Sequence, residues 1–235
     1  GSGLVGSEMC IRDSLLSVPL QIVFSFCIAL MLNSNIKGKS VFRTIFYLPT
    51  IVPAVASSIV WMMMFDPDTG FLNTLLKAAG LPASKWIYGE STAIPSLALM
   101  SLWTVGGTVV IFLAGLQNVP KELYEAVDVD GGGWFSKLKA VTIPMVSPTI
   151  FFNLVMSFIS SFQVFSQAYI MTSGGPNNAT LFYVYYMYRE AFQYGNIGVA
   201  SALGWILFVI ILVLTMLVFR SSALWVFYDG EVKNK

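Results

Sequence analysis

Histidine is absent from this chain of 235 residues, and charged residues make up only 11% of it. The sequence therefore lacks the commonest metal ligand and the commonest general base, and we expect neither a metal site nor catalytic residues. A soluble domain normally carries about 25% charged residues, so this chain has too little charge to cover a surface in water. Its net charge of +1 gives no basic field for nucleic acid, and we expect no nucleic-acid partner.

Cysteine is also scarce. Cys10 and Cys27 are too few for a disulfide framework, and Cys27 lies in an apolar run, where a small thiol packs as an apolar residue. Hydrophobic residues, in contrast, make up 56% of the chain, and the mean hydropathy is +0.74. This composition predicts long apolar segments in a lipid bilayer.

Five stretches are as long as a membrane-spanning helix, which needs about 20 apolar residues, and none of them contains Asp, Glu, Lys or Arg. They are residues 15–32, 44–65, 93–116, 147–171 and 198–219. Pro49 and Pro53 predict a kink in the second stretch, which is tolerated in a membrane when neighbouring helices satisfy the freed carbonyls. The sequence therefore predicts an all-α, polytopic membrane bundle with about five visible spans.

Positive charge is distributed unevenly between the two sides of these spans. Nine lysine or arginine residues fall on one side and three on the other. The nine are Lys37, Lys39, Arg43, Lys121, Lys137, Lys139, Arg220, Lys233 and Lys235, and the three are Lys77, Lys85 and Arg189. Because positive residues collect on the cytoplasmic side, we predict that the nine, and the C-terminal tail 226–235, are cytoplasmic.

Residues 1–14 (GSGLVGSEMCIRDS) differ from the rest of the chain. They lack the basic region and apolar core of a signal peptide and resemble read-through of a cloning or sequencing adaptor. We expect a non-native or disordered tail here, with an ordinary polar tail as the alternative. Five spans with a cytoplasmic C-terminus put the N-terminus outside, so we also expect a six-span fold that lacks its first helix.

The connection between the third and fourth predicted spans, residues 117–144, contains a short helix of its own. Pro120 suits a first helical turn and Gly131 a helix end. Leu123, Ala126 and Val127 share one face with Asp130, as their spacing indicates. This mixed apolar and acidic face predicts a docking element for a cytoplasmic partner. A helix resting on lipid is the alternative, although such helices favour Lys and Arg.

The same segment carries a recognisable motif. Glu125-Ala126-Val127, then three residues, Gly131, nine residues and Val141-Thr142-Ile143-Pro144 resemble the EAA signature of binding-protein-dependent ABC importer permeases. That signature is Glu-Ala-Ala, three residues, Gly, nine residues, Ile, one residue and Leu-Pro. The departures, at positions 127, 141 and 143, exchange one small or branched apolar residue for another and keep the spacing.

Further segments are similar to the carbohydrate-uptake branch of that family, which includes glycerol-phosphate and maltose permeases. These segments are residues 42–49, 118–124, 162–165 and 171–176. The resemblance covers about residues 15–225, which we therefore expect to form an ABC importer transmembrane domain. It implies a permease subunit that forms the membrane pathway for a sugar or sugar-like solute. It also implies a multi-pass protein of a bacterial or archaeal plasma membrane.

The resemblance further implies the partners: a second permease subunit in a heterodimer, two cytoplasmic ATPase subunits, an extracytoplasmic substrate-binding protein and the lipid bilayer. The ATPase subunits would bind ATP, because Gly38-Lys39-Ser40 lacks the first glycine of a P-loop, with Asn33 in its place. We expect no cofactor on this chain. The residues that would dock against the ATPase are Leu123, Glu125, Ala126, Asp130 and Gly131.

The substrate pathway is expected near the bilayer midplane. Hydroxyl and amide side chains suit sugar hydroxyls, which need hydrogen-bond donors and acceptors. By helical spacing and by similarity to maltose-type permeases, the candidates are Met100, Thr104, Gly107, Ser157, Ser160, Ser161, Val164 and Gln167. The alternative is that these small or hydroxylated residues pack helix against helix.

A secondary transporter or channel subunit is the rival functional class. Such a protein normally carries an ionisable residue within the membrane or a repeated filter motif. The five predicted spans have neither feature, so the sequence favours the importer.

Overall fold

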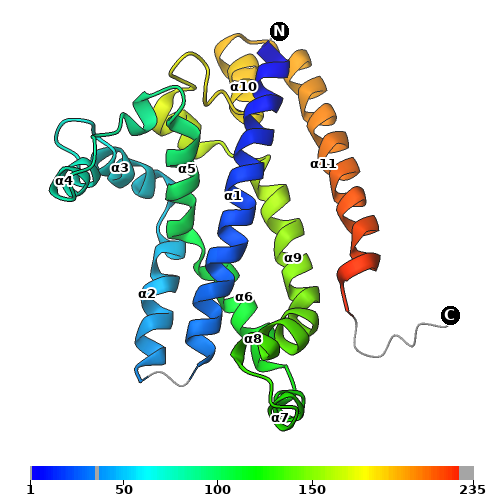
Figure 1. Ribbon diagram of the computed structural model, residues 1–235. Coiled ribbons are helices and arrows are strands. Elements are labelled where there is room, and N and C mark those ends of the chain that lie inside the picture. The colour runs from blue at the N-terminus through cyan, green and yellow to red at the C-terminus, as the bar shows by residue number, and fades with distance from the viewer. Residues whose placement is uncertain (1, 35–36, 228–235) are drawn as a thin grey trace.

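The computed structural model describes residues 2–34 and 37–227, and within these ranges every regular element is helical. Helix α7 (Lys121–Val129) lies at one end of the bundle and α10 (Tyr183–Tyr188) at the other (Figure 1), and we call these the α7 end and the α10 end. Among the described residues, three helices are long and apolar enough to span a membrane, and the number rises to five if each of two bent pairs is one span. The predicted all-α membrane bundle is therefore confirmed.

Helix α1 begins well before the predicted start of the first span. It covers Ser2–Asn33, and side chains near its start, among them Cys10 and Asp13, are buried. The expectation of a disordered tail over residues 1–14 is thus corrected, because the described part of this segment is helical and packs against the bundle. Its adaptor-like origin stays a prediction. Both cysteines are free thiols.

The second span is broken into two helices. Helix α2 (Lys39–Ile51) and helix α3 (Ala54–Met64) meet at 101°, and Figure 1 shows α2 upright and α3 turned away to the side. The break falls just before Pro53, which has no N–H to continue the helical ladder. The proline pair predicted a kink, and the structure makes it a break of more than a right angle.

The third span is also bent, which the sequence did not predict. Helix α5 (Ala93–Ser101) continues into the 3₁₀ turn η2 (Leu102–Thr104), and helix α6 (Gly106–Gln117) follows at 54°. Gly106 stands at this bend and lies directly against α2. The predicted span is therefore two helices that share one path across the bundle.

The fourth span is displaced from its predicted range of 147–171. It runs over Trp134–Ser161 as α8 (Trp134–Lys137), a π-helical turn and α9 (Ile143–Ser161). The apolar residues after Ser161 leave the helix. They include Phe162, Ala168 and Met171, all buried in a protein cluster at the α10 end. A hydropathy pattern predicts a membrane span for such a connector, because apolar residues buried in protein and apolar residues facing lipid have the same hydropathy.

The fifth span is α11 (Ile197–Trp225). Its most apolar stretch has a mean hydropathy of 2.9, and only 6% of that stretch is buried. A helix that is apolar and mostly unburied suits a lipid environment. The prediction of a span over 198–219 is confirmed and extended at both ends. Of the predicted tail 226–235, the part from position 228 onward lies outside the described residues.

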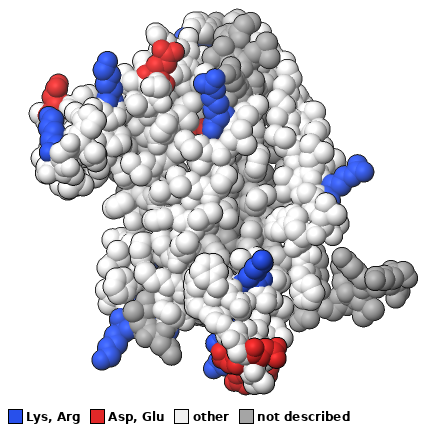
Figure 2. All heavy atoms as spheres, viewed as in Figure 1, with Lys and Arg blue, Asp and Glu red and all other residues white. Residues whose placement is uncertain are grey.

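Short elements close the α10 end. They are α4 (Phe71–Ala78), η1 (Trp86–Tyr88), η4 (Ala168–Thr172), α10 and η5 (Arg189–Gln193). On the face shown in Figure 2, charged side chains gather toward the two ends of the molecule, and the belt between them is largely free of charge. This belt matches the hydrocarbon core of a bilayer, in which an unpaired charge is costly.

Two apolar clusters hold the bundle together. One lies at the α10 end and includes Trp61, Phe65 and Phe182. The other joins α1, α6 and α9 toward the α7 end, where Phe26 and Phe112 meet edge to face with ring centroids 5.4 Å apart. The polar residues described below lie among the helices that these two clusters fix.

Candidate functional site

Helix α7 is the exposed short helix that the sequence predicted after Pro120. It carries Glu122 in its first turn and has no buried side chain. Gly131 follows with φ +74°, and its amide donates to the carbonyl of Asp128 at 3.0 Å. A Cβ on Gly131 would meet nothing within 4 Å. This glycine therefore supplies a left-handed backbone at the helix end, and it is not required for close packing within the chain.

The predicted docking residues share one property, which is exposure at the α7 end. They are Leu123, Glu125, Ala126 and Asp130, followed by the exposed Gly131. Leu123 is 38% exposed, and the neighbouring Val129, which the sequence reading missed, is 88% exposed. Apolar side chains exposed beside acidic ones on a protruding helix form a surface that suits a protein partner.

Two polar contacts join α7 to the start of the fourth span. The hydroxyls of Tyr124 and Thr142 lie 3.1 Å apart. The ammonium group of Lys137 lies 2.6 Å from the carboxylate of Asp128. Sequence reasoning missed these contacts, because nothing in the spacing indicated that the helix folds back onto residues 137–142. These contacts attach α7 to residues 137 and 142, and α9 begins at the next residue, Ile143.

A cavity of about 740 Å³ opens between the helices. Its lining includes all eight residues proposed for the substrate pathway, namely Met100, Thr104, Gly107, Ser157, Ser160, Ser161, Val164 and Gln167. The sequence placed them on two separate spans, and the structure brings them to one space. The volume is within the range of about 300–1,000 Å³ that small-molecule sites occupy.

The lining residues come from bent and broken segments. Ser157, Ser160 and Ser161 belong to the last turns of α9, whereas Val164 and Gln167 lie beyond its end. The predicted single helical face is therefore wrong for Val164 and Gln167, because α9 stops at Ser161. They still reach the cavity because the connector turns back across the bundle.

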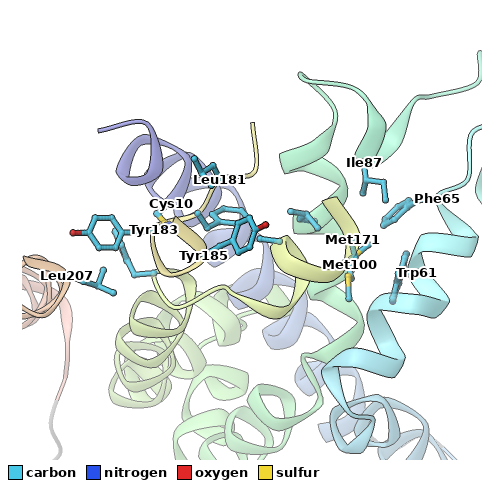
Figure 3. Close-up of a cluster of buried hydrophobic side chains, with 14 residues drawn as sticks. Cys10, Trp61, Phe65, Ile87, Met100, Met171, Leu181, Tyr183, Tyr185 and Leu207 are labelled. Carbon is cyan, nitrogen blue, oxygen red and sulfur yellow. The ribbon is translucent and has the colours of Figure 1, made fainter. Parts of the chain in front are cut away.

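Met100 has a second role in the structure. It is 4% exposed and belongs to the apolar cluster with Trp61 and Met171. Figure 3 shows Met100 beside Met171 and facing Trp61 of α3. Its presence at the cavity wall is therefore explained in part by packing, whereas Thr104 is exposed.

Several polar lining residues were missed by sequence reasoning. These are Gln21, Thr50, Ser57, Ser101, Thr108 and Asn153. Asn153 donates to the carbonyl of Thr149 at 3.0 Å, and Ser161 donates to the carbonyl of Phe158 at 2.8 Å. Single hydroxyls in apolar runs look like ordinary packing residues, so only the three-dimensional arrangement identifies them as lining.

Asp13 is the one charged residue among the described lining residues. The predicted ranges hold no Asp, Glu, Lys or Arg, but α1 begins before Leu15 and so brings Asp13 into the bundle. Asp13 lies in the segment that resembles an adaptor, and we assign it no role. From residue 15 to residue 227, outside the gap at 35–36, the cavity wall is uncharged.

Metal-ligating side chains form no cluster in the part of the chain that the structure describes. In residues 2–34 and 37–227, no group of three His, Cys, Asp or Glu side chains lies close enough to hold a metal ion. Apart from Asp13, the polar side chains that line the cavity carry hydroxyl or amide groups.

Comparison with protein families gives one match that covers most of the chain. Residues 21–226 match the family described as "Binding-protein-dependent transport system inner membrane component". The chain is 40% identical over 221 residues to the probable ABC transporter permease protein YesP of Bacillus subtilis, which covers 92% of this chain and 71% of that protein. It is 31% identical to the trehalose/maltose transport system permease protein MalF of Thermococcus litoralis, covering 86% of this chain and 69% of that protein.

Among solved structures, the fold is similar to a chain of a bacterial alginate ABC transporter in complex with an alginate pentasaccharide-bound periplasmic protein. The TM-score is 0.83 at 23% identity, covering 93% of this chain and 77% of that chain. At this identity the likeness establishes the fold alone.

Proposed function

Because the chain belongs to the family of inner membrane components of binding-protein-dependent transport systems, we propose that it is a permease subunit forming the pathway of an ATP-driven sugar importer. One observation carries this proposal: the same chain has an exposed docking helix at one end and, between its spans, a cavity lined by the eight pathway residues. Family membership favours the importer over a secondary transporter or channel, and a transport component of this kind is not itself an enzyme.

The cargo is a neutral sugar or sugar-like solute. Supporting this, the cavity wall beyond residue 14 offers hydroxyls and amides without charge. These groups donate and accept hydrogen bonds to sugar hydroxyls without the cost of burying an ion. The name of the Thermococcus relative, a trehalose/maltose permease, points to the same class of solute.

The α7 end faces the cytoplasm, with the C-terminus on that side. All nine positively charged residues of the predicted cytoplasmic group lie in connections or tails at that side of the predicted spans, as the distribution of positive charge in membrane proteins favours. Two cytoplasmic ATPase subunits then bind below, and one of them receives α7. A substrate-binding protein delivers cargo at the α10 end, and a second, different permease subunit completes the pathway.

ATP-driven movement enters the chain through α7. Glu125 is an exposed acidic residue on this helix, and it pairs with basic groups of the ATPase. Displacement of α7 is passed to α9 through the Tyr124–Thr142 and Lys137–Asp128 contacts. Because α9 carries Ser157, Ser160 and Ser161, this displacement alters one wall of the cavity and opens it alternately to each side.

Charge reversal at Glu125 tests the docking assignment. In the assembled complex in proteoliposomes, Glu125→Lys should abolish ATP-driven uptake and the ATP hydrolysis that the loaded binding protein stimulates, while the subunit still inserts. The matched control is Glu125→Asp, which keeps the negative charge on α7 and should preserve uptake and stimulated hydrolysis. Normal uptake by Glu125→Lys would remove α7 from the coupling path.

Labelling tests the orientation. In a Cys10→Ser, Cys27→Ser background, a cysteine introduced by Leu123→Cys should react with a membrane-impermeant maleimide only after the cytoplasmic face is opened. Reaction in intact cells would place α7 outside and would contradict the proposed direction of transport.

A further inference from the structure

We infer that Ser57 and the first turn of α3 form a hydrogen-bonding site for a hydroxyl of the transported sugar. This site lies at the break in the second span. This inference rests on the proposed function and adds to it a contact point outside the α9 face that the sequence indicated. The side chain of Ser57 and the N-terminal end of α3 both line the cavity.

Ser57 has an unsatisfied hydroxyl. Its side chain is 5% exposed, and its Oγ is the one buried side-chain nitrogen or oxygen in the described residues without a hydrogen-bond partner. Buried polar groups are paired in nearly all cases, and each exception calls for an explanation. The next residue, Ser58, is equally buried and follows the rule, since its Oγ donates to the carbonyl of Ala54 at 2.7 Å.

The start of α3 supplies further donors. Pro53 precedes the helix and forms no side-chain cap, and the amides of the first turn have no acceptor within their own helix. The first helical bond at this end runs from the amide of Ser57 to the carbonyl of Pro53 at 3.0 Å. Free amides and the helix dipole give this end a partial positive character that favours oxygen acceptors.

Both features belong to the cavity wall. Ser57 and Ala54 line the cavity, together with Val52 and Thr50 from the other side of the break. Ala54, Val52 and Thr50 are exposed, so a solute in the cavity can reach the start of α3, one helical turn from the buried Ser57 Oγ. Non-helical backbone at membrane depth is tolerated where it borders a polar cavity, and broken helices of transporters present their ends to the transported solute.

The chemistry favours a hydroxyl over an anionic group. A full negative charge at this depth requires a paired cation, because a helix end alone offsets only part of the cost of burial. Lysine and arginine are absent from the described lining of the cavity. A sugar hydroxyl fits instead, since its oxygen accepts from a first-turn amide while it donates to, or accepts from, Ser57 Oγ.

Transport kinetics of the assembled complex test the inference, with trehalose, maltose and an alginate disaccharide as probes. For the neutral sugar that is imported, Ser57→Ala should raise KM about three- to tenfold, as expected for one hydrogen bond lost, with kcat little changed. Ser57→Thr, which keeps the hydroxyl, should restore KM. The matched control, Ser58→Ala, removes an equally buried hydroxyl that is already paired, and should leave KM unchanged.

Singly deoxygenated analogues of the imported sugar separate cargo contact from a structural effect. The analogue that lacks the hydroxyl contacted by Ser57 should have a raised KM in the unaltered complex. For this analogue, Ser57→Ala should cause no further increase in KM. An unchanged KM in Ser57→Ala, or an equal increase for every analogue, would overturn the inference and leave the importer intact. Import of the alginate disaccharide alone would overturn the neutral-hydroxyl assignment. Failure to import any of the sugars would count against the proposed cargo and this inference together.

Discussion

Gly106 of α6 lies against the backbone carbonyl of Phe46 in α2. A Cβ at position 106 would overlap that carbonyl oxygen and come within 2.6 Å of Thr50 Oγ1. The second and third spans therefore cross at Gly106, which has no side chain. Small residues allow such close helix crossings in membranes, and this one holds the end of α2, and with it the break before α3, against the bend of the third span.

Gly106→Ala should destabilise the folded subunit. The new methyl group must displace a backbone carbonyl, and we expect a loss of at least the ~1–3 kcal/mol that overpacking usually costs. Thermal unfolding of the detergent-purified protein measures the change. The control is Gly107→Ala, where an added Cβ meets only Thr50 Cγ2, at 4.0 Å. Equal melting temperatures for the two variants would show that α2 and α6 separate without cost.

Asn73 should be required for the structure at the α10 end. Its amide group donates to the carbonyls of Pro67 and Ser84 at 2.8 and 2.9 Å, and its Oδ1 accepts from Ser84 N and from Trp86 Nε1. Asn73→Asp keeps the shape but sets a second oxygen against two carbonyls. Leaving such buried groups unpaired costs about 1–3 kcal/mol each.

Tryptic cleavage measures this effect, because Lys77 and Lys85 are exposed on either side of the loop that Asn73 secures. Cleavage should be markedly faster in Asn73→Asp than in the unaltered protein. Asn178→Asp makes the same chemical change at an exposed site and should have no effect. Identical digestion of all three proteins would contradict the role of Asn73.

The turn after α3 should open in acid. The carboxylate of Asp66 accepts hydrogen bonds from the amide of Thr69 at 2.7 Å, its hydroxyl at 2.9 Å and the amide of Asp68 at 3.0 Å. These bonds hold the pKa of Asp66 below its usual value. A lowered pKa means that the stabilisation is complete above the unfolded value of about 3.9 and is lost as pH falls through the folded value.

Hydrogen exchange at the amide of Thr69 follows this turn. Protection should stay constant above about pH 5 and fall in more acidic solution. In Asp66→Asn the acceptor oxygen does not titrate, so the acid-dependent loss should disappear. A pH profile shared by both proteins would assign the opening to other groups.

The Tyr124–Thr142 contact should be measurable as a coupling between α7 and α9. Tyr124→Phe and Thr142→Val each remove one of the two hydroxyls, which lie 3.1 Å apart. In a double-mutant cycle on thermal unfolding, we expect an interaction of about 0.5–1.5 kcal/mol. Strictly additive effects would mean that the hydroxyls stabilise the fold independently and that α7 is attached elsewhere.

Much of the architecture is readable from the sequence because lipid demands long apolar helices. The number of spans and the short helix before Gly131 follow from composition and motif, whereas helical spacing accounts for Ser157, Ser160 and Ser161 but not for Val164 and Gln167. Pro53 predicted a kink but not its angle. The angle depends on how α3 packs against Met171 and the apolar cluster at the α10 end. Gly106 gave no signal, since a glycine in a membrane helix is common.

The remaining misses have a common physical cause. Phe162, Ala168 and Met171 are as apolar as a membrane span, but they are buried in protein. Ser57 looks like a packing residue until its unpaired hydroxyl is seen beside a cavity. Asn73 lies in a polar loop, where buried amides have no distinctive pattern. In each case the role of the residue depends on contacts with residues that are distant in the sequence, and the sequence pattern does not show these contacts.

The polar cavity has a consequence for the life of the subunit in a cell. Thr50, Thr104 and Ser160 line it and are exposed, and hydroxyls turned toward acyl chains lack the partners that water or protein would give. If the proposed second permease subunit covers these hydroxyls, a lone copy in the membrane is less stable than one in the assembled pair. Even about 1–2 kcal/mol of such a deficit changes the steady-state level of a protein several-fold through proteolysis. Its abundance should then follow the synthesis of that proposed partner more closely than the transcription of its own gene.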